Sequence, residues 1–70
     1  MIEVFKTDIH EASEASWVDL VLKSSYNLKD ISFDLEDCDR ILRVEADKIE
    51  ADQIVAKLTG LGIQCSILPD

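Results

Sequence analysis

Seventy residues lie below the usual size of a protein domain, so we expect one domain over residues 1–70, built around one core. Fifteen acidic residues against seven basic ones give a net charge of −8 at pH 7, which repels phosphate backbones and argues against nucleic acid as a partner. No apolar stretch approaches the roughly 18 residues of a membrane-spanning helix, and no signal-peptide pattern opens the chain. We therefore expect a cytoplasmic protein without direct membrane insertion.

The first part of the chain predicts a strand and then a helix. Residues 2–9 are rich in β-branched and aromatic side chains and place Phe5, Thr7 and Ile9 on one side at a period of two. Residues 12–25 have apolar side chains spaced by three and four, which gathers them on one helix face. The side chains of this face are Ala15, Val18, Val21 and Leu22.

The middle of the chain predicts a β-hairpin. Polar and apolar side chains alternate over residues 28–35 and again over residues 41–46. Residues 36–39 between them are of types that favour turns. The two alternating segments are therefore expected to pair as antiparallel strands.

The last part predicts a second helix and a final strand. Asp47 and Glu50 resemble a helix-capping pair, and the apolar stripe after them stops near Gly60 and Gly62. Residues 63–67 alternate once more. The side chains of this strand that we expect to point inward are Ile63, Cys65 and Ile67.

The order of these elements predicts an α+β, ferredoxin-like βαββαβ fold, in which two helices cover one face of a four-stranded antiparallel sheet. In this topology the loops after the first strand, the second strand and the second helix lie at the same end. Acidic residues are frequent in the first two of these loops and would form an acidic end of the molecule. They are Asp8, Glu11, Glu14, Glu36, Asp37 and Asp39.

Several segments together resemble heavy-metal-associated domains, the copper-chaperone family. The resemblance begins with residues 5–14, Phe-Lys-Thr-Asp-Ile-His-Glu-Ala-Ser-Glu, followed by Val18 and Leu22. It continues through the paired segments 31–35 and 40–44 and ends with Gly-Ile-Gln-Cys at 62–65, so it covers essentially the whole chain. The resemblance implies the same βαββαβ fold.

In that family the loop after the first strand carries Met-x-Cys-x-x-Cys, whose thiolates bind Cu(I). Placing Ile9 on the family's methionine puts Glu11 and Glu14 on its two cysteines. A carboxylate is a hard ligand and does not replace thiolate toward Cu(I), so Cu(I) binding is not expected. Leu61 and Ile63 stand where the family often has Lys or Tyr, which agrees with a metal role that has lapsed.

The loop between the first predicted strand and the first predicted helix leaves two interpretations open. His10, Glu11 and Glu14 offer one imidazole and two carboxylates, a set that suits Zn(II), Ni(II) or Mn(II). Alternatively, Asp8 caps the first helix with Glu11 at its third position, and both glutamates complement the positive helix N-terminus.

Two apolar side chains leave the core stripe of the first helix. On a wheel with about 100° per residue, Trp17 lies roughly 100° from Val18 and Leu20 roughly 160° from it. They are either an anchor for a protein partner or peripheral core. On the sheet face without helices, Ile2, Val4, Ile41 and Leu68 would be exposed, and a homodimer that covers them is a further alternative.

The sequence favours a binding function over catalysis. There is no nucleophile with a base at recognisable spacing, no glycine-rich phosphate loop and a single histidine. We therefore predict a non-enzymatic interaction module, and the alternative is an atypical site for a divalent ion at His10, Glu11 and Glu14. The residues predicted to contact the protein partner are Trp17, Leu20, Glu36, Asp37 and Asp39.

Overall fold

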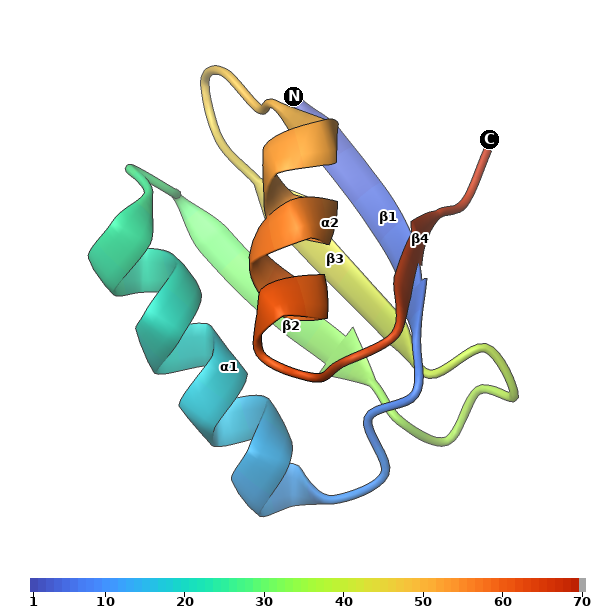
Figure 1. The fold of residues 1–70 in the computed structure, drawn as a ribbon. Helices are drawn as coiled ribbons and strands as arrows, with labels where there is room; N and C mark the ends of the chain where they lie inside the picture. Colours follow the sequence, from blue (N-terminus) through green and yellow to red (C-terminus); the bar gives the residue numbers. More distant parts are fainter. Residues whose placement is uncertain (70) are drawn as a thin grey trace.

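The computed structural model describes residues 1–69 and confirms the predicted order of elements (Figure 1). In chain order, the elements are β1 (Ile2–Thr7), α1 (Ala12–Ser25), β2 (Asp30–Asp34), β3 (Ile41–Glu45), α2 (Ala51–Gly60) and β4 (Cys65–Ile67). Each predicted element is therefore present, and the boundaries differ from the predicted ones by a few residues at most.

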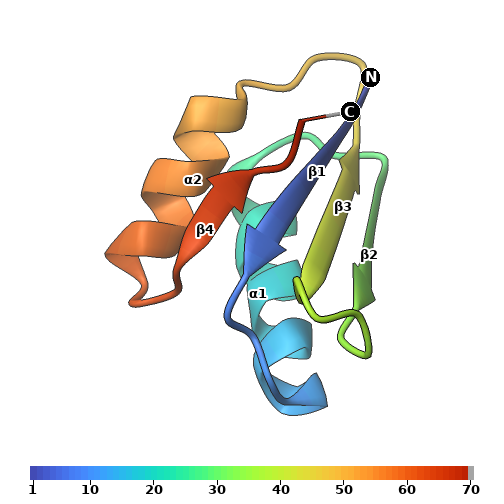
Figure 2. The same cartoon turned by 90° about the vertical axis from the view of Figure 1, so that its right-hand side faces the viewer.

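The four strands form one antiparallel sheet in the order β2-β3-β1-β4. Both helices lie on the same face of this sheet (Figure 1), and β2 and β4 form its two borders (Figure 2). The fold is thus α+β and ferredoxin-like, as the order of the predicted elements indicated.

The core lies between the sheet and the two helices. Phe5 of β1 lies opposite Leu42 of β3, and both side chains are fully buried. Thr7 and Ile9 continue the buried side of β1, as the period of two predicted. From α1 the core takes Ala15, Val18 and Leu22, whereas Val21 is only partly buried. The remaining buried members are Val44, Ile54, Leu58 and Ile63.

The predicted cap of α1 is wrong. Glu11 occupies the N-cap position and its side chain makes no capping hydrogen bond. Asp8 instead accepts a hydrogen bond from the backbone N–H of Gln64, with 3.0 Å between Oδ1 and N. Asp8 therefore connects the first loop to the start of the last strand, and not to the helix.

The predicted cap of α2 is wrong in the same way. Glu50 is the N-cap residue and has no side-chain capping bond. Asp47 lies outside the helix, and its carboxylate pairs with the Lys29 ammonium at 2.7 Å. In both cases a partner distant in sequence takes the carboxylate that the local pattern assigns to the helix end.

The end of α2 follows the predicted glycine. Gly62 has a φ of 86°, a left-handed conformation that glycine adopts without steric cost. Its N–H donates to the carbonyl of Thr59, and the N–H of Ile63 donates to the carbonyl of Leu58, both at 3.0 Å. This is the hydrogen-bond pattern of a Schellman motif, and it directs buried Ile63 back toward the core.

Strand β4 is short and lies at a border of the sheet. Ile67 lies opposite Phe5, and so on the helix side as predicted. Nevertheless 42% of Ile67 is exposed, because β4 has a neighbouring strand on one side only. Within residues 1–69, no helix is both long and apolar enough to cross a membrane.

Candidate functional site

Three connections meet at one end of the sheet. β1 and β2 both pair antiparallel with β3, so they run in the same direction and finish at the same end. The first residue of β4, Cys65, lies opposite Thr7, the last residue of β1, which brings the end of α2 there as well. The predicted meeting of the three loops is confirmed (Figure 1).

Thr7 connects two of these loops. Its backbone N–H donates to the Asp39 carbonyl at 3.1 Å, and its hydroxyl donates to the Arg40 carbonyl at 2.6 Å. The same hydroxyl oxygen accepts from the N–H of Ile9 at 3.2 Å. Thr7 is 6% exposed, so a buried hydroxyl with all its bonds made fixes the β2–β3 connection against β1.

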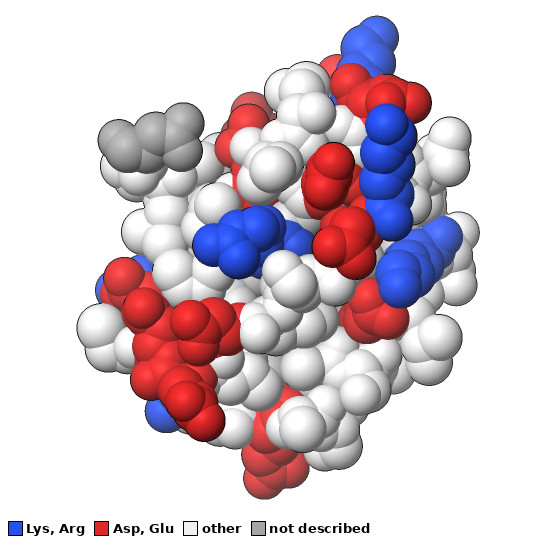
Figure 3. All heavy atoms as spheres, turned by 180° about the vertical axis from the view of Figure 1, so that it is seen from behind, with Lys and Arg blue, Asp and Glu red and all other residues white. Residues whose placement is uncertain are grey.

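The six acidic residues predicted for this end lie on two segments. Asp8, Glu11 and Glu14 are on the connection to α1 and on its first turn. Glu36, Asp37 and Asp39 are on the connection between β2 and β3. Seen from behind, acidic side chains gather at the lower left of the molecule, where the β2–β3 connection lies (Figure 3). We call Glu36, Asp37 and Asp39 the acidic turn.

Hydrogen bonds within the connection fix the shape of the acidic turn. One oxygen of Asp37 accepts from the N–H of Asp39 at 2.8 Å, and the Asp37 carbonyl accepts from the N–H of Arg40 at 3.0 Å. Arg40 has a φ of 48°, an uncommon value for a residue with a side chain. Its guanidinium donates to the Leu35 carbonyl at 2.6 Å, and this hydrogen bond connects the two ends of the turn.

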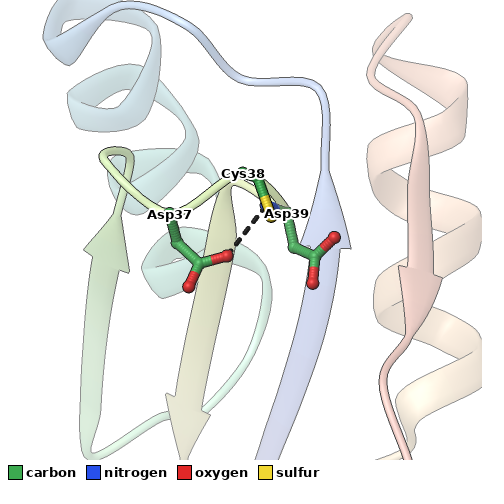
Figure 4. Close-up of side chains that lie close together, drawn as sticks. All are labelled: Asp37, Cys38 and Asp39. Carbon is green, nitrogen blue, oxygen red and sulfur yellow. Dashed lines mark hydrogen bonds between the residues drawn. The ribbon is translucent and has the colours of Figure 1, made fainter.

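The connection between β2 and β3 also contains the one group of three potential metal ligands within residues 1–69. Ligand atoms of Asp37, Cys38 and Asp39 lie within 4.8 Å of one another (Figure 4). Sequence reasoning missed this group because it treated Cys38 as a lone thiol. Both carboxylates already have partners, since Asp37 accepts from Asp39 and Asp39 pairs with Lys6 at 3.6 Å. A metal ion would take these oxygens as direct ligands and so would compete with both bonds, whereas a lysine ammonium can donate to the remaining lone pairs of the same carboxylates.

The predicted divalent-ion residues lie near one another in sequence but form no such group. His10 and Glu11 are exposed and Glu14 is partly buried. Glu14 accepts a hydrogen bond from the backbone N–H of His10 at 3.4 Å, and the Glu11 carbonyl accepts from Ala15 at 3.1 Å. The ion site at these residues therefore stays a prediction.

Trp17 and Leu20 are both on the outer side of α1. Trp17 is 46% exposed and Leu20 is 65% exposed, so each has a large apolar surface in contact with solvent. The exposed residues around them on this helix include three serines, Ser13, Ser16 and Ser24. The helix charges nearby, Lys23 and Asp19, pair with each other at 3.4 Å. The outer side of α1 thus has two exposed apolar side chains among serines and one ion pair, in a strongly acidic protein.

Cys65 lies beside a cavity of about 220 Å³ that is lined by Lys6, Thr7, Gln64, Cys65 and Ser66. Burial raises the pKa of the Cys65 thiol from 9.0 to about 11. The thiol is therefore protonated at neutral pH, which makes it a poor nucleophile and a poor metal ligand.

A second cavity, of about 250 Å³, lies at the opposite end of the molecule and contains none of the predicted site residues. Its walls come from the α1–β2 connection, the β3–α2 connection and the start of α2. They are formed by Tyr26, Asn27, Leu28, Asp47, Lys48, Ile49, Glu50, Gln53 and Ile54. No local pattern indicated this cavity, because it depends on two connections that are distant in sequence.

Comparison with known proteins does not assign the chain to a family. The chain matches no protein-family model, and it matches none of the curated proteins.

Proposed function

We propose that this chain is a small, non-enzymatic, cytoplasmic protein-interaction domain whose acidic turn contacts a basic surface of a partner protein. The observation that carries the proposal is the fixed presentation of Glu36, Asp37 and Asp39. Their turn is held by hydrogen bonds to Thr7 and within itself. A surface that is ordered before binding loses little conformational entropy when a partner arrives.

Charge complementarity supports a basic partner. Four of the seven basic residues already have partners within the chain, in three ion pairs and one hydrogen bond to a carbonyl. They are Lys6, Lys23, Lys29 and Arg40. The net charge is still −8, so a basic protein surface would be attracted over about a Debye length, roughly 8–10 Å at physiological salt.

The outer side of α1 offers a second contact. Exposed Trp17 and Leu20 are side chains of the type that dominates binding energy once a partner removes them from water. The resemblance to heavy-metal-associated domains supports an evolutionary origin of the module in that family. In this proposal Glu11 and Glu14 have replaced the two metal-binding cysteines, and binding to a protein has replaced Cu(I) transfer.

Matched variants can test the acidic turn. Glu36→Gln/Asp37→Asn/Asp39→Asn removes three charges and keeps the Asp37 side-chain oxygen as a hydrogen-bond acceptor. Asp47→Asn/Glu50→Gln/Asp52→Asn removes three charges at the opposite end. We expect the first variant to bind hexalysine about tenfold more weakly than the wild type in calorimetric titration, from roughly 0.5 kcal/mol for each exposed ion pair. The second variant should bind nearly as the wild type does. Equal losses in both variants would show that only net charge matters.

The divalent-ion alternative makes a separate prediction. Native mass spectrometry with Cu(I), Zn(II), Ni(II) and Mn(II) should show no specific one-to-one adduct if the domain binds proteins only. A one-to-one adduct that disappears in Glu11→Ala/Glu14→Ala would support a metal site with His10. An adduct that disappears in Asp37→Asn/Asp39→Asn would place a metal in the acidic turn.

A further inference from the structure

The outer edge of β2 has no neighbouring strand within residues 1–69. β2 is the first strand in the sheet order, and β3 pairs with it on one side only. In the turned view β2 forms the right-hand border of the sheet, and no segment runs beside it (Figure 2). One side of its backbone therefore has N–H and C=O groups that another chain could pair with.

The side chains of β2 alternate between two environments. Ile31 and Phe33 point to the helix side, pack against the core and remain partly exposed. Asp30, Ser32 and Asp34 are exposed on the sheet face that carries no helix. An added strand would continue both surfaces, with apolar side chains beside Ile31 and Phe33 and polar ones beside the two aspartates.

The charges next to this edge are unbalanced. Asp30 lies opposite Glu45 of β3, and like charges in that position repel. Within residues 1–69, neither carboxylate has an ion-pair partner, and nearby Lys29 pairs with Asp47. Arg43 is the basic residue of β3 on this face and lies opposite Ser32, diagonal to both aspartates of β2. On this face of β2 and β3, three carboxylates thus stand against one guanidinium.

A second copy of this chain is a poor occupant of the edge. In an antiparallel pair of β2 strands centred on Ser32, Asp30 of each copy would lie opposite Asp34 of the other. Four carboxylates would then face one another in two like-charged pairs. Like-charge repulsion thus disfavours a second copy in this register and favours a strand that has cations at these two positions.

We propose that the outer edge of β2 accepts an extended segment of a partner protein as a fifth strand, with Lys or Arg opposite Asp30 and Asp34 and apolar side chains opposite Ile31 and Phe33. The two cations are then four residues apart in the partner and on the same side of its strand. Because the partner has the same basic character, this docking site rests on the proposed function and adds a backbone-mediated contact to it.

The peptide acetyl-Lys-Val-Thr-Val-Lys-amide tests this pairing, and its palindromic sequence serves either strand direction. Titration followed by NMR should show the largest amide shifts in residues 30–34. Asp30→Asn/Asp34→Asn should weaken binding about fivefold, the effect of two exposed ion pairs. The two control peptides are Glu-Val-Thr-Val-Glu, which reverses the charge, and Lys-Val-Pro-Val-Lys, which keeps the charge but lacks the central N–H. Neither control should bind the edge.

The variant Asp37→Asn/Asp39→Asn separates the two proposals. If it weakens binding while Asp30→Asn/Asp34→Asn does not, and the shifts fall in residues 35–40, the edge site is overturned and the acidic turn is supported. If the proline peptide shifts residues 30–34 as strongly as the parent peptide, strand pairing is overturned. If no lysine peptide binds at all, both proposals fail.

Discussion

The two borders of the sheet differ in how their free edges are protected. β4 has three residues, lies beside α2 and is followed by Pro69, which has no N–H to offer a neighbouring chain. β2 has five residues, and its exposed side chains on the open sheet face include Asp30 and Asp34. A short strand and a nearby proline weaken pairing with any partner, whereas charge weakens pairing only with partners of the same charge. We therefore expect β2, and not β4, to be the edge that binds a basic partner.

The largest expected effect comes from removing the apolar side chain that attaches each edge strand to the core. Phe33 of β2 packs on the core and is only partly exposed, whereas Ile67 of β4 is 42% exposed. We expect Phe33→Ala to lower the free energy of unfolding by about 2 kcal/mol and Ile67→Ala by less than about 1 kcal/mol. Urea denaturation measures both. An equal or larger loss for Ile67→Ala would show that β4 is the better anchored edge.

A smaller effect is expected at the turn that joins β2 to β3. Arg40→Ala removes the hydrogen bond to the Leu35 carbonyl and keeps a side chain at a φ of 48°. It should cost about 1–2 kcal/mol. Arg40→Gly loses the same bond but tolerates the positive φ, so it should be more stable than Arg40→Ala by roughly 0.5–1 kcal/mol. Thermal unfolding of the pair decides this order, and a glycine variant less stable than the alanine variant would contradict it.

In β4, the partly buried thiol of Cys65 predicts a dependence of stability on pH. The folded protein keeps the Cys65 proton up to a pH of about 11, while the unfolded chain loses it near 9.0. The contribution of Cys65 to stability is therefore complete below pH 9.0 and falls as the pH rises toward 11. Because the side chain is only partly buried, we expect a loss of about 1 kcal/mol. Urea denaturation across this window should show a shallower loss for Cys65→Ala than for the wild type.

The smallest effect concerns self-association through β2. Asp30→Lys would place lysine opposite Asp34 of a second copy, twice in an antiparallel pair, and should dimerise weakly at high concentration. Asp30→Lys/Asp34→Lys restores like charges and should stay as monomeric as the wild type. Sedimentation equilibrium at low salt distinguishes them. Dimerisation of the double variant as strong as that of Asp30→Lys would mean that the association does not use this register.

Sequence patterns predicted the fold because it rests on local periodicity. The period of two correctly predicted that Phe5, Thr7 and Ile9 lie on the buried side of β1. The spacing of apolar residues by three and four correctly predicted the bounds of α1. Glycine chemistry likewise predicted the end of α2 near Gly62. These signals need no information about distant segments.

The predicted helix caps were wrong because each carboxylate binds a residue from a distant segment of the chain. Asp8 binds Gln64, which is 56 positions away, and Asp47 binds Lys29, so neither carboxylate caps its helix. A local pattern cannot reveal such competing partners. The convergence of Asp37, Cys38 and Asp39 and the juxtaposition of Asp30 with Glu45 likewise depend on the shape of a turn and on strand register.

Backbone amide exchange at the two borders of the sheet tests the central claim, that this domain binds a basic partner and that β2 is its selective edge. The measurement compares β2 and β4 amides with and without saturating Lys-Val-Thr-Val-Lys. We predict that exchange slows for amides within residues 30–34 and is unchanged within residues 65–67. Slowing at β4 alone, or unchanged exchange at both borders while the peptide is bound, would contradict it.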